Sequence, residues 1–210
     1  MSDYSPHLVL WNADDEVSLR IEQEISAVFA NCTRGNGFMF QSQPPLVVEL
    51  FNSIASWKAV LGVPATVFLA SYAKKLGEIS AEKTPALISE ILGGATESCG
   101  KLFRLAKAFL LPKVEEQRDV VVWVGFHVEG IGRAKISIPS EDEVKLIEGL
   151  AWFVHNMGDL EIAVRNLLRD TDNIQIEEDI VLVRNDEGIS VSWFDEESGP
   201  KHAVVPTKID

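Results

Sequence analysis

Two histidines in this sequence have neighbours suited to acid–base chemistry. His127 precedes Glu129 by two residues, so in a strand both side chains lie on one face, as a general base and its orienting carboxylate do. A hydrogen-bonded core histidine is the competing interpretation of the same pattern. His155 lies with Trp152 on the side of a predicted helix away from the apolar residues, and Asp159 would be one turn on if the helix continued past Gly158. These positions are candidates for a hydrolase or transferase site.

A pair of aspartates is the candidate for a metal site. Asp14 and Asp15 follow a predicted strand at 7–12, in the stretch "WNADDE". Ligands bind at the carboxyl ends of strands in parallel α/β sheets, and clustered carboxylates there can hold Mg²⁺. The alternative is that Asp14 caps the following helix and that the acids offset its dipole. No phosphate-binding glycine loop accompanies the pair, and we expect no cofactor.

Two further patterns resemble catalytic motifs only in part. "SYAK", residues 71–74, has the SxxK spacing in which a lysine activates a serine, but the motifs that accompany it in β-lactamases are missing. "GIGRAK", residues 130–135, begins like a dinucleotide-binding fingerprint, but a strand follows it and not the helix that the pyrophosphate needs. Neither pattern predicts an active site.

The charge of the chain is unevenly distributed along its 210 residues. Its net charge is −13, with 7 acids and 2 bases in residues 1–49, 4 and 8 in residues 50–113, and 21 and 9 in residues 114–210. Because nucleic-acid binding requires a basic footprint, we expect no nucleic-acid partner. The middle segment is the only basic part.

The basic middle segment carries a stripe of cations along one predicted helix. Lys101, Arg104 and Lys107 line the side opposite the apolar residues, with no acid between Cys99 and Val114. Such a surface attracts an acidic face of a partner protein or of a second copy. The alternative is a solvated helix face that offsets the acidic C-terminal third of the same chain.

Three aromatic side chains are predicted to anchor a partner. Trp57 and Phe68 lie in apolar helical patterns bordered by lysines, among them Lys74, and Trp152 lies on the polar side of its helix. Exposed aromatic anchors of this kind are typical of contact sites. The alternative is that residues 46–76 cover the protein's own sheet and that the C-terminal strands cover Trp152.

The sequence predicts a cytoplasmic protein without a transmembrane segment. The N-terminus does not resemble a targeting signal, and Cys32 and Cys99 form no CxxC pair, as expected of a reducing compartment. The 15 uncharged residues between Lys58 and Lys74 would span about 22 Å as a helix, short of the roughly 30 Å hydrocarbon core. Peripheral membrane contact through residues 46–76 is a further alternative.

The apolar pattern predicts an α+β fold. A strand at 7–12, a helix capped by Asp14 and a strand at 37–43 would form an N-terminal β-α-β unit. Breaks at glycine or proline, Gly62 and Pro64 among them, divide the middle segment into several helices. These predicted helices cover 46–61, 65–76, 85–92 and 99–111.

The C-terminal part reads as hairpin, helix, helix, hairpin around one sheet. Residues 120–138 form a hairpin whose first strand, apolar on both faces, is central. Ser140 and Glu143 form a capping box, and Gly158–Asp159 ends that helix and begins the next. Further strands follow, with a turn at "NDEG" and an edge strand at "HAVVP". Two units, 1–112 and 113–210, or one compact domain, 1–210, are both compatible with this order.

Together these observations favour a non-catalytic interaction or regulatory protein. Its contact surface would be the basic, apolar middle segment, and its partner another protein or a second copy of the chain. The alternative is a small hydrolase or transferase that uses His127, Glu129 and His155, or Asp14 and Asp15. No motif supports the transfer of a function from a known family.

Overall fold

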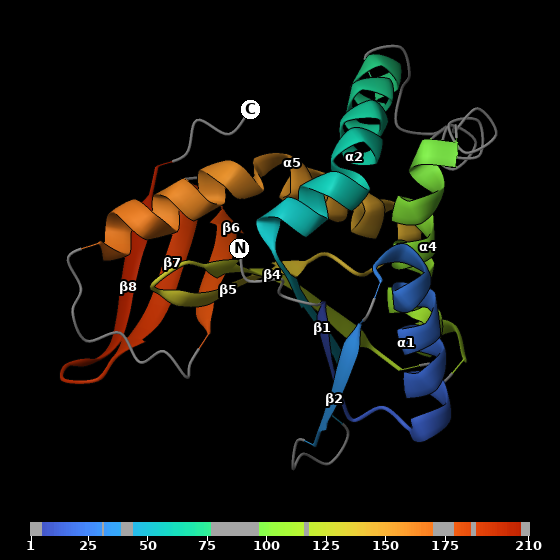
Figure 1. Cartoon of the computed structure of the whole chain (residues 1–210), viewed down its shortest axis with the longest axis horizontal. Helices are drawn as coiled ribbons and strands as arrows, with labels where there is room; N and C mark the ends of the chain where they lie inside the picture. The colour runs from blue at the N-terminus through green and yellow to red at the C-terminus, as the bar shows by residue number, and fades with distance from the viewer. Residues whose placement is uncertain are drawn as a thin grey trace.

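The strands in the described part of the chain form a single mixed sheet in the order β2-β1-β3-β4-β5-β6-β7-β8 (Figure 1). The computed structural model describes residues 6–30, 32–38, 44–76, 97–115, 118–169, 179–185 and 188–206. The strands are β1 (His7–Trp11), β2 (Thr33–Gly37), β3 (Leu46–Asn52), β4 (Val120–Val128), β5 (Gly132–Ile138), β6 (Ile180–Asn185), β7 (Gly188–Asp195) and β8 (Gly199–Val205). The described helices are α1 (Asp15–Val28), α2 (Ile54–Leu76), α4 (Glu97–Glu115) and α5 (Glu143–Leu168).

From β2 to β7 parallel strand pairs alternate with antiparallel ones, and β8 adds a further antiparallel pair. The pairs β1/β2, β3/β4 and β5/β6 are parallel, and a segment containing α1, α2 with α4, or α5 connects each of them. The pairs β1/β3, β4/β5, β6/β7 and β7/β8 are antiparallel. The crossover β1-α1-β2 moves toward one edge of the sheet, and the crossover β5-α5-β6 moves toward the other edge. Because β1 and β5 run in the same direction and α1 and α5 cover the same face, the two crossovers have opposite hands.

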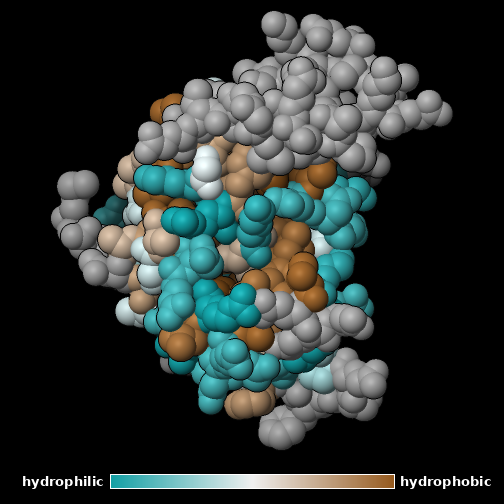
Figure 2. Space-filling view, turned by 90° about the vertical axis from the view of Figure 1, so that its right-hand side faces the viewer, coloured by the Kyte–Doolittle hydropathy of each residue, from teal (hydrophilic) through white to brown (hydrophobic). Residues whose placement is uncertain are grey.

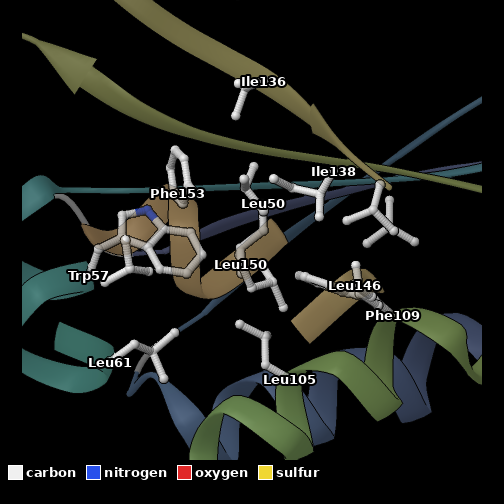
Figure 3. Packing of buried hydrophobic residues seen from close by; sticks show 14 of the residues in the cluster. Leu50, Trp57, Leu61, Leu105, Phe109, Ile136, Ile138, Leu146, Leu150 and Phe153 are labelled. Atoms are coloured by element: carbon white, nitrogen blue, oxygen red, sulfur yellow. The ribbon is translucent and has the colours of Figure 1, made fainter. Parts of the chain in front are cut away.

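The described helices cover one face of the sheet and enclose the core. Alternate strand residues such as Leu50, Ile136 and Ile138 point into it (Figure 3). The indole of Trp57, on α2, is fully buried there and donates a hydrogen bond of 3.0 Å to the carbonyl of Gly125. Its ring meets Phe153 of α5 edge-on, with centroids 5.4 Å apart. In Figure 1, α5 lies along β6–β8, whereas α1 and α4 lie side by side at the other end.

The segment 46–61, predicted as one amphipathic helix, is a strand followed by a helix. β3 takes residues 46–52, all buried, between β1 and β4. An apolar run of this length suits a strand buried on both faces as well as a helix face. The helix begins after Ser53, whose hydroxyl accepts a hydrogen bond of 3.1 Å from the Ser56 amide. Asn52 and Ser53 are therefore the cap signal that the helical pattern concealed.

Two predicted helix breaks are also wrong. α2 continues through Gly62 and Pro64, and α5 continues through Gly158 and Asp159. Glycine and proline inside a helix cost about 1 and 3 kcal/mol, but burial of one face of each helix outweighs this cost. The predicted capping box is wrong as well, because Asp142 caps α5 and accepts a hydrogen bond of 2.9 Å from the Lys145 amide. Ser140 instead donates to the carbonyl of Val120 at 2.6 Å.

Other predicted elements are confirmed. Asp14 caps α1 and accepts a hydrogen bond of 2.8 Å from the Val17 amide. β1 and β2 are parallel, although β2 begins at Thr33, four residues before the predicted strand, and residues 39–43 lie outside the described part. β4 is central, it forms a hairpin with β5, and β8 is an edge strand. The predicted helix at 85–92 also lies outside the described residues.

The sheet joins the two predicted units, because β3 belongs to the first unit and pairs with β4 of the second. α4 also crosses the predicted boundary, since it extends past Pro112 to Glu115. Whether the chain divides into two domains stays a prediction. Within the described ranges, no helix is both long enough and apolar enough to cross a membrane.

Candidate protein-binding surface

α1 and α4 pack side by side and leave a groove of about 460 Å³ between them. The groove has an apolar floor and a largely cationic border, and we call it the α1–α4 groove. The floor is formed by Phe103, Ala108 and Leu111, and the border by Arg20, Gln23, Glu24, Arg104 and Lys107. Figure 2 shows this side of the molecule, where apolar side chains lie among hydrophilic ones.

The spacing of residues along α4 produces this groove. Leu102, Leu105 and Phe109 are buried in the core, so the stripe at 101, 104 and 107 turns outward. Arg104 Nε lies 3.2 Å from Glu24 Oε2 of α1, and both side chains are about half exposed. An ion pair so open to water contributes only about 0–1 kcal/mol, and a ligand can therefore compete for Arg104 at little cost. The predicted basic stripe thus lines a groove that has an apolar floor.

Lys113, at the end of α4, has a structural role. Its ammonium donates to the backbone carbonyl of Glu141 at 2.7 Å and to that of Ser140 at 3.3 Å. It therefore ties the end of α4 to the segment that precedes α5.

The three predicted aromatic anchors are buried, so they do not form an exposed patch. Trp57 is 0% exposed and Phe68 is 1% exposed, and both belong to the core. Trp152 is 9% exposed, and the guanidinium of Arg184, on β6, lies 4.6 Å from the centre of its ring. A residue of a C-terminal strand therefore covers Trp152, as the alternative interpretation expected. The side chain of Lys74 lies outside the described part.

The histidines do not meet. His127 lies on β4 and points to the face of the sheet opposite the described helices, near Arg133, His7 and Asp179. Burial and the charges of Arg133 and His7 lower its pKa, against a raising effect of Asp179. His155 is exposed on α5, on the other side of the sheet, and Glu129 is exposed in the β4–β5 turn. The sheet therefore separates the two histidines that the sequence offered as candidates for one site.

The two aspartates lie at the start of α1, and both cysteine thiols have a raised pKa. Asp14 serves as the cap of α1, and Asp15 is exposed in its first turn. In the part of the chain that is described, no three His, Cys, Asp or Glu side chains gather as a metal site. Burial, together with the charge of Glu22, raises the pKa of Cys32 to about 11, and burial also raises the pKa of Cys99. Both thiols are therefore protonated at neutral pH, unlike a thiolate nucleophile.

An ion network that sequence analysis missed lies on the opposite face of the sheet. Lys135 of β5 bridges Glu49 of β3, at 2.7 Å, and Asp179, at 2.9 Å, and Asp179 also pairs with Arg133 at 2.8 Å. Burial lowers the pKa of Lys135, but the hydrogen bonds and charges of Glu49 and Asp179 outweigh it and raise the pKa. Glu49, Lys135 and Asp179 are far apart in sequence, on β3, on β5 and just before β6, so no local pattern reveals their contact.

Sequence reasoning also missed the α1 side of the groove. Arg20 and Glu24 are one turn apart on α1 and line the groove opposite α4. Their spacing marks an exposed helix face, but only the packing of α1 on α4 brings this face to the basic stripe.

The fold and the groove define an α+β protein with a basic, apolar-floored surface cleft. No family model, no curated protein and no solved structure matches the chain.

Proposed function

We propose that this chain is a non-catalytic protein-interaction or regulatory protein and that the α1–α4 groove is its contact surface. The observation that carries the proposal is the combination of an apolar floor with a largely cationic border in a chain whose net charge is −13. A local basic surface attracts acidic partners, even though the net charge of the whole protein would repel them.

The groove suits an acidic amphipathic segment of a partner protein. Apolar side chains at helical spacing would fill the space above Phe103 and Leu111, and carboxylates would pair with Arg104 and Lys107. Apolar contacts would supply affinity, while the charges select for acidic partners and speed the encounter. The second occupant to consider is an acidic face of another copy, because residues 114–210 carry 21 acids and 9 bases.

A displayed library of 16-residue peptides, selected on the immobilised protein, tests the proposal. We expect enrichment of acidic peptides with apolar residues at i, i+3/i+4 and i+7, and loss of their binding to the double variant Arg104→Glu/Lys107→Glu. The matched control is Arg169→Glu/Lys201→Glu, which changes the net charge equally at exposed positions on α5 and β8.

Two results would overturn this assignment. One is a selection that enriches no acidic peptide; the other is a peptide that binds both double variants and the wild type equally. Light scattering of the chain alone tests the second occupant. A dimer that Arg104→Glu/Lys107→Glu dissociates, and the control does not, would assign the groove to self-association.

A further inference from the structure

The cavity at the carboxyl ends of β5 and β6 is separate from the α1–α4 groove. These parallel strands pair only from 134–136 to 180–182, although β5 extends to Ile138 and β6 to Asn185. Beyond this point they border a cavity of about 620 Å³, which the first half of α5 closes on another side. Ligands of α/β proteins bind at the carboxyl ends of parallel strands, and small-molecule sites measure roughly 300–1,000 Å³.

The walls of this cavity are largely apolar, and α5 packs closely on β5 there. Leu69, Ile136, Ile138, Trp152 and Leu182 line it, from α2, β5, α5 and β6. A Cβ atom at Gly149 would lie 2.5 Å from Cγ2 of Ile138, so α5 reaches β5 at this distance only because the residue is glycine. The cavity therefore offers a defined apolar surface to the body of a ligand.

The polar groups at the cavity include two cationic side chains, Lys145 and Arg184. The guanidinium of Arg184 lies over the ring of Trp152, and within the described ranges no carboxylate pairs with Arg184 or with Lys145. Trp152 Nε1 is buried and has no hydrogen-bond partner among the described residues. The cavity's cationic side chains, rather than this enclosed N–H, are therefore the groups that can pair with an anionic ligand.

Two carboxylates limit the charge that the cavity accepts. Glu141 and Glu148 also line it and offset the two cations, Lys145 and Arg184. A polyanion such as a nucleotide therefore gains little, whereas one carboxylate placed at Arg184 gains a charge-assisted hydrogen bond.

We infer that this cavity binds a small monocarboxylate with an apolar body. The carboxylate pairs with Arg184 beside the ring of Trp152, and the body covers Ile136, Ile138 and Leu182. This site does not depend on the proposed protein-binding role of the α1–α4 groove, and either can fail without the other.

Decanoate below its micelle concentration is the probe, with decanol and decylamine as the matched neutral and cationic controls. We expect saturable binding of decanoate by calorimetry and a shift of one indole N–H resonance, assigned to Trp152 by its loss in Trp152→Phe. Arg184→Met removes a charge-assisted hydrogen bond and should weaken binding about tenfold or more. Arg169→Met, an exposed arginine at the end of α5, should leave the affinity unchanged.

A second variant tests the charge argument by removing a negative charge from the cavity. Glu148→Gln removes a repulsive carboxylate and should tighten decanoate binding. Three results would overturn the inference: no saturable binding of decanoate, equal binding of decanol or decylamine, or an Arg184→Met variant with wild-type affinity and an unmoved Trp152 resonance.

Discussion

The two faces of the sheet are stabilised in different ways. The face under the described helices is largely apolar, with Leu8, Leu50 and Val124 at 0% exposure. The opposite face joins charges that are far apart in sequence, with Lys135 between Glu49 and Asp179. Hydrophobic burial thus stabilises the face under the helices, and ion pairs fix the side chains on the opposite face. A partner is expected on neither, because the α1–α4 groove lies outside the sheet.

Two aromatic rings on the opposite face lie directly over glycines, which leave room for them. The ring of Phe51 lies across Gly125, where a Cβ atom would be 2.5 Å from the ring and 2.6 Å from the carbonyl of Ala134. Arg133 covers the other side of this ring, 4.9 Å from its centre. Trp11 lies across Gly37 in the same way and donates to Glu49 at 3.3 Å. Specific contacts therefore fix side chains on the face opposite the described helices too.

The largest expected effect is on the covered face. Trp57→Ala removes a fully buried indole and its hydrogen bond to Gly125, and it should lower the free energy of unfolding by about 3–5 kcal/mol. Trp11→Ala, on the opposite face, should cost about 1 kcal/mol, since Trp11 is half-buried. Urea unfolding measures both, and equal losses would contradict the contrast between the faces.

The ion network gives the next effect. Lys135→Met leaves Glu49 and Asp179 without their shared cation and should cost roughly 1–3 kcal/mol at neutral pH. Because the pKa of Lys135 is raised in the folded state, its stabilisation is complete below about pH 10.4 and is lost as pH rises through the folded pKa. The difference between wild type and Lys135→Met in urea should therefore shrink at high pH, and a constant difference would exclude this linkage.

The groove is expected to contribute little to stability. Arg104→Ala breaks an ion pair whose two side chains are about half exposed, so the free energy of unfolding should change by less than about 1 kcal/mol. The same variant should weaken binding of an acidic peptide. A large loss of stability would mean that Arg104 supports the packing of α1 on α4 and not a partner.

The smallest effect concerns His127. Its pKa is lowered in the folded state, so the unfolded chain takes up a proton first as pH falls below about 6.5. The native protein should therefore lose stability from pH 7 toward pH 5, and His127→Gln should lose less. Urea unfolding at these two pH values measures the difference, and identical losses would show that His127 is not responsible.

Local signals predicted only part of this molecule. The cap at Asp14 and the β4–β5 hairpin depend on neighbouring residues, and both are present. β3 was misassigned because seven apolar-rich residues satisfy a helix face and a doubly buried strand equally well. Trp57 was predicted to face either the protein's own sheet or a partner, because an apolar helix face suits both; it lies in the core, against Phe153 of α5.

The candidate site was predicted in one half only. The stripe of Lys101, Arg104 and Lys107 is visible as a repeat of three along one helix. Its partner, α1, is about eighty residues away in sequence, so the apolar floor and Glu24 join it only through packing. For the same reason the contact between Lys135 and Glu49, 86 residues apart, has no sequence signal.

The affinity of a selected acidic peptide for three forms of the chain tests the central claim most directly. The forms are the wild type, Arg104→Glu/Lys107→Glu, and the control Arg169→Glu/Lys201→Glu, compared by calorimetry in one buffer. The groove account predicts binding about tenfold or more weaker for the first variant and unchanged for the control, because only the first loses charge-assisted contacts. Equal affinities for all three forms would contradict the assignment of the α1–α4 groove as the contact surface.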